Sequence, residues 1–417
     1  MKLDLHSPGD GLFGTHITWE DIEKQIQNET NLNLFFGPKK NAQVIGEGNG
    51  FLSKVVVIEP DFQVATNCLP SKFVVKMFTA VACNELAESN KNQYEEAQRT
   101  MQTIVEREEM YRNMHNREVF FYRVFSRFDN SISKISRLFF AQDFTDGNEL
   151  KGFIGMEYME NAQLRHIYHN VIPGELSDVL HAIAYLEAKS VGLGDDEKKK
   201  MDTNPLWASI PARVNPVTVR KLFRGIHTAS EELKPTGEEL EEIAEELVSL
   251  ELNTTMNNEL GMQDVLIHGD LWSTNMLWRR TPDGMRLSGI VDYQMAHFRC
   301  SSIDLCKLLI TTLSGKDRRE NWERLLEEFH GYIKEYCHGD LPFTLEQLKE
   351  SYRRLFPLSG LLVLEAFGPI AKIAVEKLLD EEKKNAEAVL LERTITLIED
   401  MLFFAKRNRD VRETSGK

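Results

Sequence analysis

The chain has 417 residues, of which 42% are hydrophobic, and its formal net charge is −15 with a pI near 5.3. This length exceeds what one hydrophobic core usually serves, so two folded parts are expected and disorder is excluded as the main state. The acidic charge balance excludes a surface for nucleic acid or for an anionic membrane, because either partner requires a basic footprint.

The amino terminus and the cysteines favour a cytoplasmic location. Residues 1–11 contain acidic residues and no apolar segment of signal-peptide length. The most apolar stretch downstream, residues 355–364, contains Pro357 and Gly360, is too short to span a bilayer, and predicts a pair of buried helices. The five cysteines lack the spacing of a metal site, so reduced structural thiols are expected.

The first predicted elements are a helix and two strands joined by glycines. Thr18 and Asp21 form a capping-box pattern that predicts a helix to about residue 29. Residues 42–45 and 51–59 predict strands, and the glycines between them allow backbone amides to approach a phosphate closely: Gly46, Gly48 and Gly50. An ordinary hairpin turn explains the same glycines. A dinucleotide-binding loop would be followed by a helix, and the sequence has no G-x-x-x-x-G-K-[ST] phosphate loop.

A lysine lies within the next predicted strand, residues 72–78. Lys76 is costly among apolar residues unless it is paired, although a lysine that reaches solvent from an edge strand also fits. The helix predicted over residues 92–128 offers Glu118, an acid on an apolar face, as its partner. Alternative partners lie in a charged run that is typical of a solvated face: Glu106, Glu108 and Glu109. The long connection after residue 79 predicts one additional helix.

Two further strands, at residues 138–144 and 153–159, are predicted around the turn Asp146-Gly147-Asn148. They complete a five-stranded antiparallel sheet. The residues alone predict an ordinary core strand at residues 157–159.

The rest of the chain is mainly helical. Residues 176–190 have apolar side chains at helical spacing, and residues 238–251 predict an acidic amphipathic helix with a solvated face. A helix follows Asp304, and residues 322–408 predict a run of further helices.

The stretch that carries chemistry lies at residues 265–309. An apolar run stops at Gly269, so Asp270 follows on a loop at the end of a short strand, where a carboxylate can act. Asn275 precedes a second strand, and Asp292 ends a third one after the turn at residues 282–284. A hairpin of these two strands would bring Asn275 and Asp292 together. One amide oxygen and one carboxylate suit Mg²⁺, which fills its octahedron with water and phosphate oxygens, and Asp270 is left as a proton acceptor.

These residues resemble a known family. The pattern is His268-Gly269-Asp270-Leu271-Trp272 with Asn275, then Val291-Asp292-Tyr293-Gln294, then Asp304-Leu305. It is similar to the choline kinase and aminoglycoside phosphotransferase superfamily, and most closely to its ecdysteroid-kinase-like (CHK kinase-like) branch. The whole pattern is far more specific than any part of it. The resemblance spans residues 46–305 and implies an α+β, protein-kinase-like fold with two lobes. A nucleotide-binding lobe with a small antiparallel sheet is implied at residues 1–159, and a mostly helical lobe for catalysis and substrate binding at residues 160–417.

The resemblance also implies roles for the matched residues. Asp270, with His268, is implied to be catalytic and to accept a hydroxyl proton, whereas Asn275 and Asp292 are implied to bind Mg²⁺. ATP is the implied cofactor, with Lys76 on its α- and β-phosphates and Glu118 as the partner of that lysine. The other implied nucleotide contacts are Gly46, Gly48, Gly50 and Ser53 over the phosphates and Glu157, Tyr158 and Met159 at the adenine edge. Asp304 is implied to brace the catalytic loop, although an ordinary acid at a helix N-terminus is an alternative.

The spacing after Asp292 favours a small substrate. Only eleven residues separate Asp292 from Asp304, which leaves no room for the longer segment with which protein kinases hold a peptide. We therefore expect phosphoryl transfer from ATP to a hydroxyl of a small molecule, with no stable protein partner. Choline, a steroid alcohol and an aminoglycoside all remain open as acceptors. The alternative is a catalytically silent kinase-like module that binds a nucleotide or metabolite, but such a module would not require the full set: Lys76, Glu118, Asp270, Asn275 and Asp292.

Overall fold

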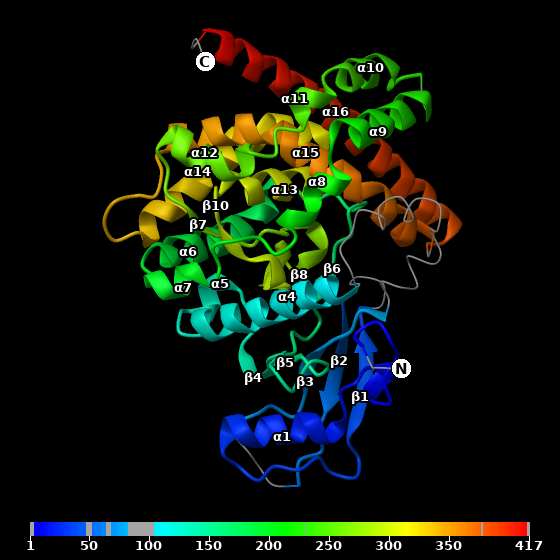
Figure 1. The fold of residues 1–417 in the computed structure, drawn as a ribbon, viewed down its shortest axis with the longest axis vertical. Helices are drawn as coiled ribbons and strands as arrows, with labels where there is room; N and C mark the ends of the chain where they lie inside the picture. Colours follow the sequence, from blue (N-terminus) through cyan, green and yellow to red (C-terminus); the bar gives the residue numbers. More distant parts are fainter. Residues whose placement is uncertain are drawn as a thin grey trace. The chain divides into compact units, whose positions relative to one another are not determined.

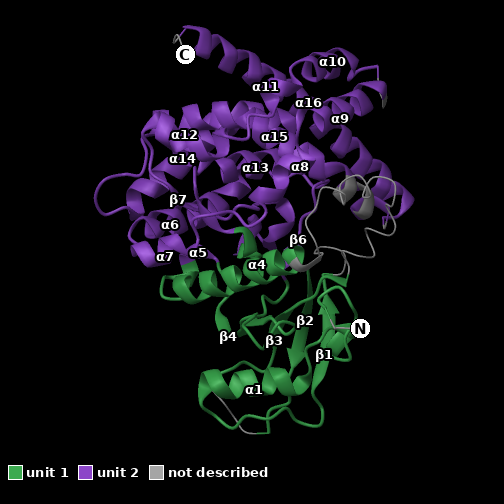
Figure 2. Cartoon of the chain, in the orientation of Figure 1, with its two compact units in different colours: residues 1–131, 135–161, 291–295 green, residues 132–134, 162–290, 296–417 purple. Residues whose placement is uncertain are grey.

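The computed structural model describes residues 4–46, 52–63, 68–81, 104–229, 231–376 and 378–414. The chain divides into two compact units (Figure 2). Unit 1 comprises residues 1–131, 135–161 and 291–295, and unit 2 comprises residues 132–134, 162–290 and 296–417. The predicted loop glycines Gly48 and Gly50, the additional helix expected after residue 79 and the start of the helix predicted from residue 92 lie outside the described residues.

Unit 1 is built on a five-stranded sheet in the order β1-β2-β3-β5-β4, in which every neighbouring pair is antiparallel (Figure 1). The strands are β1 Asn41–Ile45, β2 Ser53–Glu59, β3 Phe73–Phe78, β4 Leu138–Gln142 and β5 Phe153–Glu157. The predicted five-stranded antiparallel sheet is confirmed. Strand β3 lies inside it, with β2 on one side and β5 on the other, so both edges of β3 are hydrogen-bonded.

Helix α1 (Trp19–Thr30) packs on this sheet after a short 3₁₀ turn, η1 (Leu12–Gly14). Its start is a capping box, because the Asp21 N–H donates to Thr18 Oγ1 at 3.3 Å and the Thr18 N–H donates to Asp21 Oδ2 at 2.9 Å. Its buried residues, Ile22 and Ile26, join the core cluster that contains Phe73 on β3. The predicted helix start is confirmed, and the helix serves packing.

Helix α4 (Ile104–Phe125) supplies the second buried surface of unit 1, and the short α5 (Asn130–Ser133) follows it. Its Glu118 is buried beside the buried apolar residues Tyr122 and Phe125. The ring of Phe121 stacks on Tyr293, with ring centroids 3.8 Å apart and 11° between the planes. This stacking ties the 3₁₀ turn η5 (Tyr293–Met295), far along the chain, to the helix that carries Glu118.

Unit 2 is mostly helical and contains two small sheets, β10-β7 and β6-β8-β9. Its strands are β6 Gln163–Leu164, β7 Val265–Ile267, β8 Met276–Thr281, β9 Gly284–Ile290 and β10 His297–Arg299. Its helices are α6 Ser177–Val191, α7 Asp195–Lys199, α8 Ile210–Arg213, α9 Pro216–Ala229, α10 Lys234–Glu242, α11 Ala244–Leu247, α12 Leu252–Leu260, α13 Ser302–Thr312, α14 Gly315–Tyr336, α15 Leu345–Glu376 and α16 Asp380–Thr414. Three 3₁₀ turns complete it, η2 Pro173–Leu176, η3 Trp207–Ser209 and η4 Ser273–Asn275. Together with the sheet of unit 1, this architecture confirms the predicted α+β class, with a small antiparallel sheet in unit 1 and a mostly helical unit 2.

Two of the helix predictions in unit 2 are wrong. The stretch at residues 355–364 is part of one continuous helix, α15, which passes through Pro357 and Gly360. A proline inside a helix costs on the order of 3 kcal/mol, and the burial of the apolar side chains of this helix offsets that cost. A Cβ at Gly360 would lie 2.7 Å from Met401 Cγ on α16, so glycine permits the close approach of the two helices. The acidic helix predicted over residues 238–251 is instead α10 and α11, separated at Ile243, where ψ is 17°.

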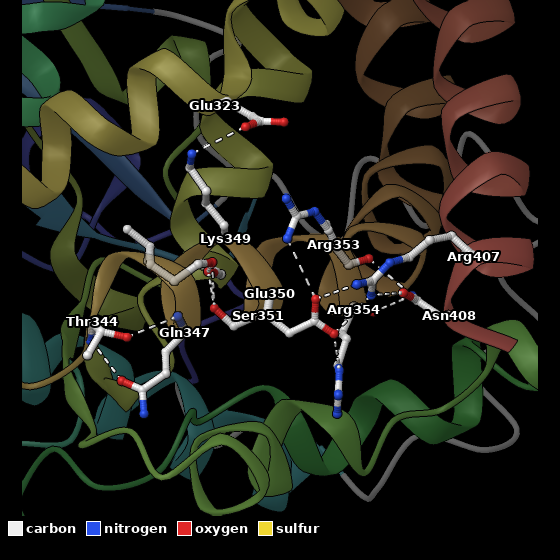
Figure 3. A network of polar contacts seen from close by, with 12 residues as sticks. Glu323, Thr344, Gln347, Lys349, Glu350, Ser351, Arg353, Arg354, Arg407 and Asn408 are labelled. Carbon is white, nitrogen blue, oxygen red and sulfur yellow. Dashed lines mark hydrogen bonds and ion pairs between the residues drawn. The ribbon is translucent and has the colours of Figure 1, made fainter. Parts of the chain in front are cut away.

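A polar network fixes α15 against its neighbours (Figure 3). Glu350 accepts hydrogen bonds from Arg354 Nε at 2.8 Å and from Arg407 Nη2 on α16 at 2.6 Å. Burial raises the pKa of Glu350, but these guanidinium groups lower it by more, so its pKa lies below the ordinary value. On the same helix, Lys349 Nζ donates to Glu327 Oε1 on α14 at 2.7 Å. These contacts hold α15 to both α14 and α16.

In the part of the chain that the structure describes, no helix combines the length and apolar composition needed to cross a membrane.

Candidate active site

A buried lysine with two carboxylate partners is the first feature of the candidate site in unit 1. Lys76 lies on the central strand β3, between Val55 on β2 and Ile154 on β5. Its Nζ donates to Glu118 Oε2 at 2.6 Å and to Asp292 Oδ1 at 2.7 Å. The side chain of Lys76 is 12% exposed and that of Glu118 is 1% exposed. The alternative of a lysine reaching solvent from an edge strand is therefore wrong.

The charges in this cluster depend on one another. Burial lowers the pKa of Lys76, but the carboxylates of Asp292 and Glu118 more than offset this, and the pKa lies above its ordinary value. Burial raises the pKa of Glu118, and Lys76 opposes that rise. Removing Lys76 would therefore leave a buried carboxylate without its cation.

Asp292 adopts a backbone conformation that is uncommon for a residue with a side chain. Its φ is 69°, in the left-handed region, which costs non-glycine residues energy and which aspartate tolerates better than most residues. The Oδ1 atom accepts from Lys76, and Oδ2 accepts a long hydrogen bond of 3.4 Å from Gln294 Nε2. The next residue, Tyr293, stacks on Phe121.

In unit 2, the loop that follows β7 is held by one carboxylate. Asp304, in the first turn of α13, is 1% exposed and accepts from the backbone N–H of His268 at 2.5 Å and of Gly269 at 3.0 Å. Gly269 has φ of 78°, a conformation that glycine adopts without strain and that turns the chain out of the strand. Burial raises the pKa of Asp304, and His268, Lys307 and the two N–H donors offset part of the rise. Asp304 therefore braces this loop through the backbone and does more than an ordinary acid at a helix start.

Asp270 lies on this braced loop with its carboxylate 32% exposed. Its backbone N–H donates to His268 Nδ1 at 3.2 Å, and the imidazole of His268 is buried. His268 thus contacts the backbone of Asp270 and not its carboxylate. The carboxylate has a cationic partner that the sequence did not predict, because Lys307 Nζ lies 3.0 Å from Asp270 Oδ1. The available signal was spacing, since Lys307 falls three positions after Asp304 and so shares its helix face.

Asn275 ends the same loop within the turn η4. Its Nδ2 donates to the backbone oxygen of Asp270 at 2.8 Å, which leaves the amide oxygen as the atom that can bind a cation. The next residue, Met276, pairs with Ile290 in the predicted hairpin of β8 and β9. Asp292 follows Ile290 by two residues in the sequence.

The chemistry of the side chains can be compared with the ligands that metals require. Among the described residues, no three His, Cys, Asp or Glu side chains cluster as a metal cage would require. Asp292 in unit 1 offers a carboxylate and Asn275 in unit 2 offers an amide oxygen, and both are oxygen ligands of the kind that a hard cation such as Mg²⁺ takes. Each side chain therefore fits Mg²⁺ by its own chemistry.

The remaining predicted nucleotide residues all belong to unit 1. Gly46 follows β1 with φ of 67°, and Ser53 begins β2 opposite Phe78. Glu157 ends β5, where its N–H donates to the Arg137 oxygen at 2.9 Å. The ring of Tyr158 faces Lys72 Nζ at 5.1 Å, and Met159 is partly exposed. Gly48 and Gly50 are outside the described residues.

Comparison with known proteins identifies the family. The family model DUF1679, described as "Uncharacterized oxidoreductase dhs-27", matches residues 5–409. The chain is 26% identical over 302 residues to the uncharacterized kinase-like protein D1044.1 of Caenorhabditis elegans, covering 70% of this chain and 77% of that protein. It is 25% identical over 219 residues to the uncharacterized oxidoreductase dhs-27 of the same organism, covering 50% of this chain but only 25% of that protein.

Among solved structures, the chain is similar to choline kinase from Cryptosporidium parvum, with 10% identity, a TM-score of 0.43, and coverage of 90% of this chain and 91% of that one. It is also similar to the ADP-bound aminoglycoside phosphotransferase APH(2'')-Ib, with 15% identity, a TM-score of 0.39, and coverage of 90% and 98%. The family model covers nearly the whole chain, so the chain belongs to the DUF1679 family.

Proposed function

We propose that this protein is a small-molecule kinase that uses ATP and Mg²⁺ and transfers the γ-phosphoryl group to a hydroxyl of its substrate. The observation that supports this most is the position of Lys76, whose side chain is 12% exposed on a central strand and has Glu118 and Asp292 as its two partners. One carboxylate is enough to neutralise the ammonium of Lys76. When a phosphate binds to this lysine, the second carboxylate is free to bind another ligand.

Each unit supplies a different part of the proposed chemistry. Lys76 in unit 1 orients the α- and β-phosphates, with Glu118 holding its ammonium in place. Asp270 in unit 2 accepts the proton of the acceptor hydroxyl. The loop that carries Asp270 is held by the hydrogen bonds from two of its backbone N–H groups to Asp304. The catalytic effect is mainly positioning and charge neutralisation.

The proposed metal ligands are Asp292 and Asn275. When bound, Mg²⁺ supplies neutralisation of charge on the phosphate oxygens. Asp292 Oδ1 is bonded to Lys76, whereas Oδ2 accepts a long hydrogen bond from Gln294, so Oδ2 is the oxygen that we assign to the metal. The Nδ2 hydrogen bond of Asn275 leaves its amide oxygen for the same role. His268 has no proposed contact with a substrate, and we assign it to holding the backbone of Asp270.

The name oxidoreductase does not carry over to this chain. The match to dhs-27 covers a quarter of that protein, and the other three quarters lie outside the match. The kinase-like relative is matched over most of its length, and its printed name agrees with the motifs. We therefore propose activity as a phosphotransferase. The alternative to be tested is a module that binds nucleotide without turnover.

The test has two stages on the full chain. Isothermal titration with ATP and Mg²⁺ should give saturable binding, and a metabolite extract incubated with ATP should then contain a phosphorylated product that Asp270→Asn does not make. Binding without any product would identify a sensor module. No binding at all would contradict both functions.

A further inference from the structure

Helix α13 presents a cation as well as an acid to the loop of Asp270. Asp304 accepts the two backbone N–H groups of the loop, and Lys307, three positions later, donates from Nζ to the backbone oxygen of Gly269 and to Asp270 Oδ1, both at 3.0 Å. The same ammonium lies 5.6 Å from the ring centroid of Trp272. Its side chain is 17% exposed.

We propose that Lys307 is a positioning residue that occupies Asp270 Oδ1, leaves Oδ2 for the acceptor hydroxyl, and disfavours acceptors with a positive charge close to that hydroxyl. The proposal rests on the proposed function, because it takes Asp270 as the group that faces the acceptor. It deepens that function by naming the charge class of the substrate.

The geometry fixes which oxygen of Asp270 is left for substrate. Among the described residues, Lys307 is the group that bonds the carboxylate, and it bonds Oδ1 alone. Exposed ion pairs are weak because both side chains move freely. This lysine is instead held by two oxygen acceptors and an aromatic ring, so it can restrain the rotation of the carboxylate.

The same contact sets the local charge. A lone carboxylate would attract a cationic alcohol, but Lys307 compensates the charge of Asp270. Asp304, a second acid on α13, is 1% exposed, and its two oxygens are taken by backbone N–H groups. An ammonium group on a substrate would be repelled by Lys307 at a distance of a few ångströms. This repulsion should lower kcat/KM for such a substrate on the order of ten-fold or more. Uncharged or anionic alcohols are favoured over choline-like and aminoglycoside-like ones.

The positioning role is tested without knowledge of the natural substrate, by using water as the acceptor. Hydrolysis of ATP in the presence of Mg²⁺ is measured for the wild type, Lys307→Met and the conservative Lys307→Arg. We expect Lys307→Met to lower kcat on the order of ten-fold to a hundred-fold with little change in KM for ATP, and Lys307→Arg to recover most of the loss. Melting temperatures of the three proteins identify any general loss of folding. Such a loss would lower activity in proportion to the folded fraction, and Lys307→Arg would not recover it.

An unchanged kcat in folded Lys307→Met would overturn the positioning role while the proposed kinase function stood. If the wild type binds ATP but neither hydrolyses it nor phosphorylates a metabolite, the proposed function fails, and the role of Lys307 fails with it. The two failures are therefore distinguishable.

The charge selection is tested with two alcohols of the same shape, choline and 3,3-dimethylbutan-1-ol, in which a carbon replaces the quaternary nitrogen. Each is measured as an acceptor and as an inhibitor of ATP hydrolysis. We expect the wild type to favour the uncharged alcohol about ten-fold or more, and Lys307→Met to narrow that ratio. Equal behaviour of the two alcohols with the wild type, or a preference for choline, would overturn the charge selection.

Discussion

Lys76 and Asp292 lie 216 positions apart in the sequence, and the ammonium of the first donates to the carboxylate of the second at 2.7 Å. Glu118 accepts from the same ammonium at 2.6 Å and is almost completely buried. The pairing couples β3, α4 and the turn after β9 within unit 1. Its energetic consequence is that Glu118 depends on Lys76 more than Asp292 does, because Asp292 is 28% exposed and can be hydrated.

The Lys76–Glu118 pair should be visible as non-additivity. We expect Lys76→Met and Glu118→Ala each to lower kcat/KM for ATP. The double variant should lose less transition-state free energy than the sum of the two single losses, with a coupling free energy of about 0.5–3 kcal/mol. The exposed Lys39→Met in the same unit is the matched control and should leave kcat/KM unchanged. Strict additivity would show that the two side chains do not act together in the nucleotide site.

Asp270→Asn preserves the size of the side chain and cannot accept a proton. We expect a loss in kcat on the order of 10²–10⁴-fold, with nucleotide affinity and melting temperature little changed. The measurement is steady-state kinetics on the identified acceptor together with titration of ATP. Near-full turnover by this variant would mean that Asp270 only braces its loop.

Asp292→Asn removes a charged oxygen from the proposed hard-cation site, so it should weaken Mg²⁺ more than it weakens the nucleotide. Titrating Mg²⁺ into protein with ADP should give a higher half-saturation for this variant than for the wild type. Asp283→Asn, on the exposed turn between β8 and β9, removes the same charge elsewhere and should have no effect. An unchanged Mg²⁺ dependence in Asp292→Asn would exclude it as a ligand.

Asp304→Ala should destabilise the protein, because it leaves two buried N–H donors, on His268 and Gly269, without an acceptor. At roughly 1–3 kcal/mol for each of the two unsatisfied donors, we expect a loss on the order of 2–6 kcal/mol in the free energy of unfolding. Asp304→Asn keeps one acceptor oxygen and should lose less. Urea unfolding of the two variants measures both losses, and a loss below about 0.5 kcal/mol in the alanine variant would disprove the bracing role.

His115 predicts a pH dependence of stability in unit 1. Burial, assisted by the positive charges of Lys76 and Arg123, lowers its pKa from 6.5 to about 4. The unfolded chain binds a proton on this residue first as the pH falls, so its contribution is fully present above pH 6.5 and is lost between pH 6.5 and pH 4. The expected loss is roughly 3 kcal/mol over that range.

The matched variant for this test is His115→Gln, which can still donate to the Gln142 oxygen that His115 Nε2 contacts at 2.9 Å but cannot titrate. Urea unfolding at pH 7, 6 and 5 should show a steeper loss of stability for the wild type than for the variant. Parallel curves would show that His115 is not the residue responsible.

The elements that local patterns specify were predictable from the sequence. The capping box at Thr18, the sheet of unit 1 and the hairpin of β8 and β9 follow from residue periodicity and turn chemistry, which act over a few positions. The continuity of α15 was not predictable, because tertiary burial overrides the local signal of Pro357. Asp292 gives no sequence sign of its left-handed backbone, because neither of its neighbours in the sequence is a turn residue such as glycine or proline.

The candidate site follows the same division. Lys76, Glu118 and Asp270 could be selected from motifs and from the cost of burying charge, and the structure brings Lys76 and Glu118 into contact. Lys307 was missed, because its importance depends on where α13 lies against the loop after β7. The catalytic and ligand roles of all these residues stay predictions until they are measured.

The most direct test of the central claim is mass spectrometry of a metabolite extract incubated with the full chain, Mg²⁺ and ATP labelled with ¹⁸O in its γ-phosphoryl group. The account predicts a metabolite that gains a labelled phosphoryl group in stoichiometric balance with ADP, with the wild type and not with Asp270→Asn. Saturable ATP binding without any labelled product, across extracts that contain uncharged, anionic and cationic alcohols, would contradict it and identify a nucleotide-binding module.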